Sequence, residues 1–149
     1  MEYRNVGSVF NRITHFVLHK TISFNWIRDA KECADNLNEL KNHTFGRILI
    51  PPFFFSLEDK VIHMEIEYVK GAHINASAMK IVYEECVLKD GFSITNYSHT
   101  NFIKEYETNQ IYYVDIEDVG YKDIEERKKR FKLSLESTPI VKYMHSSKP

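Results

Sequence analysis

A short apolar run that ends in a group of acids is the feature that most constrains how this chain folds. Residues 111–114 read IYYV, and such β-branched and aromatic side chains predict a buried strand. Asp115, Glu117 and Asp118 follow this strand directly. Carboxylates gathered at the end of a buried strand repel one another unless a cation or hydrogen-bond donors lie among them. The segment therefore predicts either a site for a hard divalent cation such as Mg²⁺ or a loop whose acids point into water.

The wider segment 96–120 resembles the catalytic core of the protein-kinase-like superfamily. The resemblance is to a minimal, atypical member of the branch that phosphorylates small molecules such as aminoglycosides, choline or lipopolysaccharide. In that family a catalytic loop ending in D-x-x-x-x-N leads into a short hairpin, and the hairpin ends in a metal-binding Asp. Asn101 matches the loop Asn, and Asp115 matches the metal-binding Asp. Asn96 stands where the family has its catalytic Asp, so the chain departs from the pattern at that position.

The resemblance implies a particular set of roles for these residues. Asn101, Asp115 and Glu117 are the implied Mg²⁺ ligands, and Asn96 and Asp115 are the implied catalytic residues. Asn96 can orient a hydroxyl group by hydrogen bonding, but it cannot accept a proton at neutral pH.

Residues 7–20 predict two strands joined by a tight turn, and Lys20 lies at the end of the second. The resemblance implies that Lys20 holds the α- and β-phosphates of a nucleotide. Judged without the resemblance, Lys20 is more simply interpreted as an exposed lysine on an edge strand.

Apolar side chains recur at helical spacing up to residue 40, and Ser23 or Asn25 can cap the predicted helix. The resemblance implies that an acid on this helix pairs with the strand lysine. Glu32 and Glu39 are the candidates, and Glu32 is preferred. A solvated helix acid fits the same pattern.

Residues 47–69 predict two strands around a polar turn at 57–60, and Pro51 and Pro52 interrupt the first of them. Residues 61–69 alternate between apolar and polar side chains, as in a half-buried strand. The resemblance implies that this strand runs into a hinge whose backbone binds adenine, at Glu67, Tyr68 and Val69.

Two more helices are predicted, from residue 75 or 77 to 88 and over residues 121–137. The basic cluster at 127–130 in the second of them is interpreted as a solvated helix face. The predicted fold is α+β, in one kinase-like domain over residues 1–149. An N-lobe-like antiparallel sheet with one packed helix occupies 1–70, a truncated C-lobe with the catalytic-loop hairpin occupies 71–135, and 136–149 forms a tail.

Composition narrows the class of protein. The formal net charge of −1 gives no strong attraction to nucleic acid or to an anionic membrane. Cys33 and Cys86, isolated from each other in the sequence, fit a reducing compartment. No signal peptide or apolar run of membrane-spanning length is visible, so we expect a cytoplasmic protein.

The sequence thus predicts an ATP- and Mg²⁺-dependent phosphotransferase of unknown acceptor. The alternative is a non-catalytic, pseudokinase-type module that binds nucleotide or protein. A metal-dependent nuclease using Asp115 and Glu117 would explain the acids, but the chain lacks an acid-x-lysine signature and a basic surface. Because the reduced C-lobe would leave apolar surface uncovered, we also expect a protein partner or a second copy of the chain.

Overall fold

The computed structural model describes residues 5–12, 17–43, 45–89, 92–94, 97–117, 119–121, 123–136 and 138. The predicted α+β class is confirmed. The chain forms two compact units, of which the first is Met1–His43 with Pro51–Val69 and the second is Thr44–Ile50 with Lys70–Pro149. The sequence interpretation divided the chain after residue 70, one residue beyond this division, but it did not assign Thr44–Ile50 to the later part.

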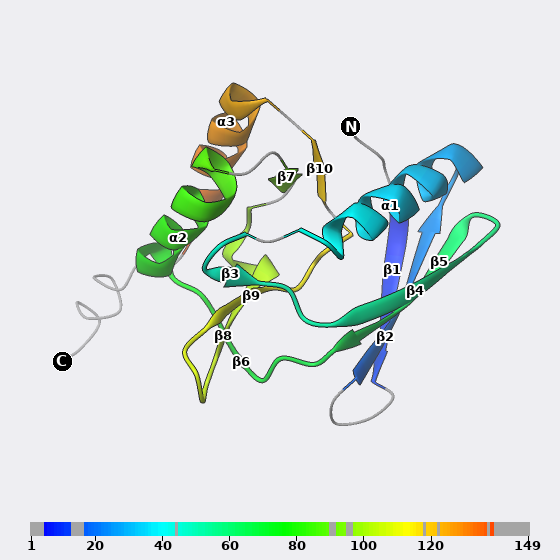
Figure 1. Ribbon diagram of the computed structural model, residues 1–149, viewed down its shortest axis with the longest axis horizontal. Coiled ribbons are helices and arrows are strands. Elements are labelled where there is room, and N and C mark those ends of the chain that lie inside the picture. The colour runs from blue at the N-terminus through cyan, green and yellow to red at the C-terminus, as the bar shows by residue number, and fades with distance from the viewer. Residues whose placement is uncertain are drawn as a thin grey trace. The chain divides into compact units, whose positions relative to one another are not determined.

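The first unit is an antiparallel sheet with one helix packed on it (Figure 1). Its strands lie in the order β1-β2-β5-β4, so that β5 separates β2 from β4. The elements are β1 (Asn5–Arg12), β2 (Val17–Phe24), α1 (Ile27–Leu40), β4 (Phe53–Glu58) and β5 (Val61–Glu67). These bounds confirm the predicted strand pair, helix and second hairpin.

The core of the first unit follows from the alternation of its strands. In β5 the side chains of Ile62, Met64 and Ile66 are buried while their neighbours are exposed or half-buried. Helix α1 packs against β2, β4 and β5 and brings the apolar stripe predicted from its spacing. The predicted caps are wrong. Helix α1 begins after Trp26 without a side-chain cap, because the ladder of β2 with β5 continues to Ser23 and holds that residue in the sheet.

The second unit holds a four-stranded sheet in the order β3-β9-β8-β6 and a separate pair, β7 with β10. Its strands are β3 (Ile48–Leu49), β6 (Gly71–His73), β7 (Phe92–Ile94), β8 (Phe102–Glu105), β9 (Ile111–Tyr113) and β10 (Val119–Tyr121). Its helices are α2 (Ala76–Val82), which continues as a π-helix over Tyr83–Leu88, a 3₁₀ turn at His99–Asn101, and α3 (Ile124–Leu135). The predicted helices and the β8–β9 hairpin are confirmed.

Aromatic side chains form much of the core of the second unit. Tyr97, Phe102 and Tyr113 are fully buried. Phe131 of α3 packs on Tyr83 with 5.0 Å between ring centroids, and on Tyr97 at 5.8 Å. This contact holds α3 beside the helix formed by α2 and the π-turns (Figure 1).

One buried acid fastens the segment Thr44–Ile50 to the helix of the second unit. Glu85 accepts hydrogen bonds from the backbone N–H of Arg47 at 2.7 Å, from Arg47 Nε at 3.1 Å and from Lys89 Nζ at 2.7 Å. The Arg47 guanidinium also contacts Glu84 at 2.7 Å. These bonds satisfy a carboxylate that burial would otherwise make costly.

Candidate functional site

The β8–β9 hairpin brings Asn101 and Asp115 to the same end of two neighbouring strands. Phe102 lies opposite Tyr113, and the N–H of Val114 donates to the carbonyl oxygen of Asn101 at 2.9 Å. This bond extends the ladder one residue beyond the strands. Because paired strands lie about 4.8 Å apart, the backbones of Asn101 and Asp115 are close neighbours.

The loop that enters the hairpin is held by its own hydrogen bonds. Ser98 caps the 3₁₀ turn, since its hydroxyl accepts from the N–H of Thr100 at 3.3 Å and its carbonyl accepts from the N–H of Asn101 at 2.9 Å. The Asn101 side chain is buried. The turn therefore fixes the position at which Asn101 meets the second strand.

The residues after β9 become more buried along the chain. Asp115 is half-buried, whereas Ile116 and Glu117 are buried, with Glu117 only 3% exposed. Asp118 lies outside the described residues. The described part of the chain contains no group of three or more His, Cys, Asp or Glu side chains that could hold a metal ion. A cation at this end of the hairpin would accordingly need the Asn101 amide oxygen beside Asp115, and oxygen donors of both kinds suit Mg²⁺.

Lys20 lies in the first unit, in the interior strand β2. Its side chain is 2% exposed, and it shares a buried face with Ile22 and with Met64, its partner across the ladder. This placement rules out the simpler interpretation of an exposed edge-strand lysine, because β1 and β5 flank β2 on both sides. A lysine so deeply buried needs compensation for its lost hydration.

The helix acids are less buried than the resemblance implies. Glu32 is half-buried and Glu39 is exposed. No ion pair between Glu32 and Lys20 is found in the part of the first unit that the structure describes. The buried polar side chain of α1 is Asn36, which is 2% exposed.

Sequence reasoning missed Asn36, although its spacing carried the signal. Asn36 follows Cys33 by three residues and precedes Leu40 by four, so it falls on the buried stripe of α1. A polar residue on an apolar stripe is more informative than an acid at its edge.

The predicted adenine hinge lies where the first unit ends. The N–H of Glu67, the last residue of β5, donates to the carbonyl of Pro52 at 3.0 Å. Tyr68 and Val69 follow as half-buried residues outside any strand. Their role in nucleotide binding stays a prediction.

Asn96, the residue at the predicted catalytic-base position, lies outside the described residues. His99, three residues further on, is half-buried, and its Nδ1 is buried without a hydrogen-bond partner in the described structure. Burial lowers the pKa of His99, and the positive field of His73, whose ring centroid is 6.2 Å away, lowers it further. A neutral imidazole at pH 7 can accept a proton, which Asn96 cannot.

The basic cluster of α3 was predicted to be a solvated helix face, and this prediction is wrong at Arg127. Arg127 is buried, and its Nε donates to the carbonyl of Val87 at 2.8 Å. Arg130 pairs with Glu126 at 2.8 Å, and Lys128 lies 3.7 Å from Glu125. These contacts engage three of the four cations of the cluster within the second unit.

Comparison with known protein families finds no family that matches this chain, and comparison with curated proteins finds no match either. None of the described helices combines the length and apolar character needed to cross a membrane.

Proposed function

We propose that this protein binds ATP and Mg²⁺ and transfers a phosphoryl group, as a minimal relative of the small-molecule kinases. The observation that carries the proposal is Lys20, a lysine buried on the face of the sheet that α1 covers. The chain places it on the strand directly before the helix, as the resemblance requires.

The order of the remaining elements supports the same proposal. Strand β5 leads toward the proposed hinge, a helix follows, and a capped turn then enters the β8–β9 hairpin. Asn101 precedes the hairpin and Asp115 follows it, as the metal ligands of the family do. An arrangement of this kind fits phosphoryl transfer, in which a protein contributes mainly positioning and neutralisation of charge.

Each residue has a stated part in the proposal. The Lys20 ammonium binds the α- and β-phosphates, and the backbone at 67–69 binds the adenine. Asn101 and Asp115 hold Mg²⁺, with Glu117 as a further oxygen ligand, and the ion neutralises phosphate charge when bound. Asn96 orients the hydroxyl group of the acceptor.

Asn96 also supports a second candidate function, a non-catalytic module that binds nucleotide or a protein partner. A positioned general base contributes about 10²- to 10⁴-fold to a rate, and an amide cannot supply it. The neutral His99 in the same loop favours the catalytic proposal, because it offers a proton acceptor.

The first test is thermal unfolding with and without ATP and Mg²⁺. A ligand at about 100 times its dissociation constant stabilises a protein by roughly 2.7 kcal/mol. We expect a rise in the midpoint that requires Mg²⁺ and is lost in Asp115→Ala and in Lys20→Met. Glu107→Ala and Lys31→Met, at exposed positions of the same two units, are the matched controls and should keep the rise. An unfolding midpoint that does not change at millimolar ATP would contradict the nucleotide-binding proposal.

A second test separates the two candidate functions. Asn96→Asp restores the residue that the family has at this position, so phosphoryl transfer from ATP should increase about 10²- to 10⁴-fold if the site is an impaired enzyme. A variant that binds MgATP as tightly as the wild type and transfers no phosphate would favour the non-catalytic module.

A further inference from the structure

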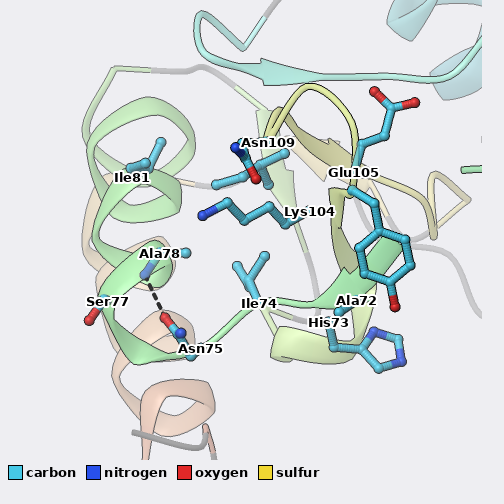
Figure 2. Close-up of a pocket in the computed structure, with 12 residues that line it drawn as sticks. Ala72, His73, Ile74, Asn75, Ser77, Ala78, Ile81, Lys104, Glu105 and Asn109 are labelled. Carbon is cyan, nitrogen blue, oxygen red and sulfur yellow. Dashed lines mark hydrogen bonds between the residues drawn. The ribbon is translucent and has the colours of Figure 1, made fainter. Parts of the chain in front are cut away.

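A pocket of about 560 Å³ lies within the second unit, between α2 and strands β6 and β8 (Figure 2). This volume falls in the range of roughly 300–1,000 Å³ that is typical of sites for small molecules. We propose that the pocket binds a small organic monoanion, an apolar body bearing one carboxylate, with Lys104 as its counter-ion. The proposal is independent of the nucleotide site.

The apolar part of the pocket comes from both of its walls. Ala78 and Ile81 project from α2, Ile74 precedes the helix, and Ile111 lies in β9. Because β6 and β9 flank β8, Ala72 and Ile111 lie on either side of Lys104 on one face of the sheet. The face is therefore apolar around a single cation, which suits a ligand with an apolar body and one charged group.

Lys104 has no partner for its charge among the residues that the structure describes, in which no hydrogen bond or ion pair involves its side chain. Figure 2 shows this side chain extending across the pocket toward α2. An ammonium group at the mouth of an apolar pocket forms charge-assisted hydrogen bonds with a carboxylate. Ser77 and Asn109 belong to the same lining, to which Asn109 adds an amide.

The acid of the lining does not neutralise Lys104. Glu105 accepts a hydrogen bond from the Thr108 hydroxyl at 2.5 Å, and Figure 2 shows its carboxylate directed away from the Lys104 amine. Its negative charge still borders the site, and His73 contributes an imidazole to the lining beside the one lysine and the one acid. One lysine ammonium opposed by one carboxylate suits a monoanion better than a dianion or a nucleotide.

The pocket is separate from the proposed Mg²⁺ residues. Tyr106 and Asn109 place it at the turn of the β8–β9 hairpin, whereas Asn101 and Asp115 lie at the opposite, open end. Failure of one proposal therefore leaves the other unaffected.

The test is an NMR titration of the full chain, labelled with ¹⁵N, with three probes that each carry a phenyl ring. Phenylacetate carries the carboxylate, phenylacetamide is its neutral isostere, and phenyl phosphate carries a larger charge. We expect phenylacetate to shift the amide signals of α2 and of the hairpin turn. Its dissociation constant should be at least about tenfold lower than that of phenylacetamide, as one charge-assisted hydrogen bond predicts. Equal affinities for the acid and the amide would overturn the proposal, and tighter binding of phenyl phosphate would overturn its assignment to a carboxylate.

Lys104→Met keeps the length of the side chain and removes its charge, so it should abolish the preference for phenylacetate. Lys80→Met is the matched control, because Lys80 is exposed on α2 but does not line the pocket. Ala78→Phe fills the pocket and should prevent the binding of all three probes. Unchanged phenylacetate affinity in both Lys104→Met and Ala78→Phe, with unchanged unfolding midpoints, would place any binding elsewhere.

Discussion

At the scale of single residues, the acidity of Glu85 is strongly altered by its partners. The hydrogen bond from Lys89 is the largest cause, and the backbone N–H of Arg47 is the next; together with the Arg47 guanidinium they lower the pKa of Glu85 to about 2. The ordinary value for the group is 4.5. The carboxylate is therefore bound far more strongly in its charged form than in its protonated form.

This shift predicts how stability depends on pH. Because the folded-state pKa lies below the unfolded one, the contribution is fully present above about pH 4.5 and is lost as the pH falls through about 2. One pKa unit corresponds to about 1.4 kcal/mol, and the solvent exposure of both partner cations reduces the full value, so we expect about 2 kcal/mol at neutral pH.

Chemical denaturation of the wild type and of Glu85→Gln from pH 7 to pH 2.5 measures this contribution. The difference in unfolding free energy should be constant down to about pH 5 and then narrow. Glu84→Gln removes a more exposed acid that contacts Arg47 alone, and it should cost less. A difference between wild type and Glu85→Gln that does not change with pH would contradict the assignment.

Gly46 makes room for the same carboxylate. Its φ of 60° lies in the left-handed region, and a Cβ at this position would collide with the Glu85 carboxylate. We expect Gly46→Ala to destabilise the protein by more than about 1 kcal/mol, through backbone strain and displacement of Glu85. Thermal unfolding measures the loss, and an unchanged midpoint would show that Glu85 can move without cost.

The burial of a single residue was predictable only where a local pattern carries it. The spacing of α1 carries the burial of Asn36, whereas the burial of Lys20 depends on the strands that flank β2 on both sides. The burial of Glu85 was not predictable, because its partner Arg47 is 38 residues away in the sequence and no local pattern joins them.

At the scale of elements, periodicity predicted the long strands and helices and failed for the short ones. Helix α1 and strand β5 carry enough helical or alternating positions to be recognised, whereas β9 was recognised from its β-branched and aromatic side chains. Strands β6, β7 and β10 have three residues each, which is too few for a period to show. The π-turns of Tyr83–Leu88 continue the apolar spacing of α2, so the sequence predicts one helix where the hydrogen bonding changes partway.

Helix α3 offers a test at this scale, because its start depends on one side chain. The Asp123 carboxylate accepts a hydrogen bond from the N–H of Glu126 at 2.8 Å. Asp123→Ala should destabilise the protein by about 1 kcal/mol, as the loss of an N-cap does. Glu125→Ala removes an acid from the same turn that caps nothing, so it should cost a few tenths of a kcal/mol at most. Equal effects on the thermal midpoint would mean that charge at the helix start matters and the cap does not.

At the scale of the whole molecule, the sequence predicted the α+β class and the order of the longer elements. The sequence did not predict the pairing of β3 with β9, which places Thr44–Ile50 in the second unit. Parallel pairing across more than 60 residues leaves no mark on either strand alone, and β3 has two residues. Pro51 and Pro52 mark where the chain passes back to the first unit.

The expected association with a partner or a second copy stays a prediction, and the exposed apolar side chains of α3 offer a test of it. Leu133 of α3 is 61% exposed, and Ile124 and Leu135 of the same helix are 38% and 37% exposed. Removing such a side chain from water is favourable by about 25 cal/mol per Å² of apolar area, so a second copy that covers the face of α3 that carries Leu133 gains from its burial. We expect the weight-average sedimentation coefficient to rise with protein concentration.

Leu133→Gln should weaken this concentration dependence because it removes the most exposed apolar side chain of α3 without adding charge. Lys129→Gln is the control, because it introduces glutamine at another exposed position of the same helix. It should leave the association as it is in the wild type. Loss of the association in Lys129→Gln alone would mean that charge on α3 drives the contact. A single monomeric species at every concentration would show that α3 carries its exposed leucines without a second copy, as isolated apolar side chains on protein surfaces commonly do.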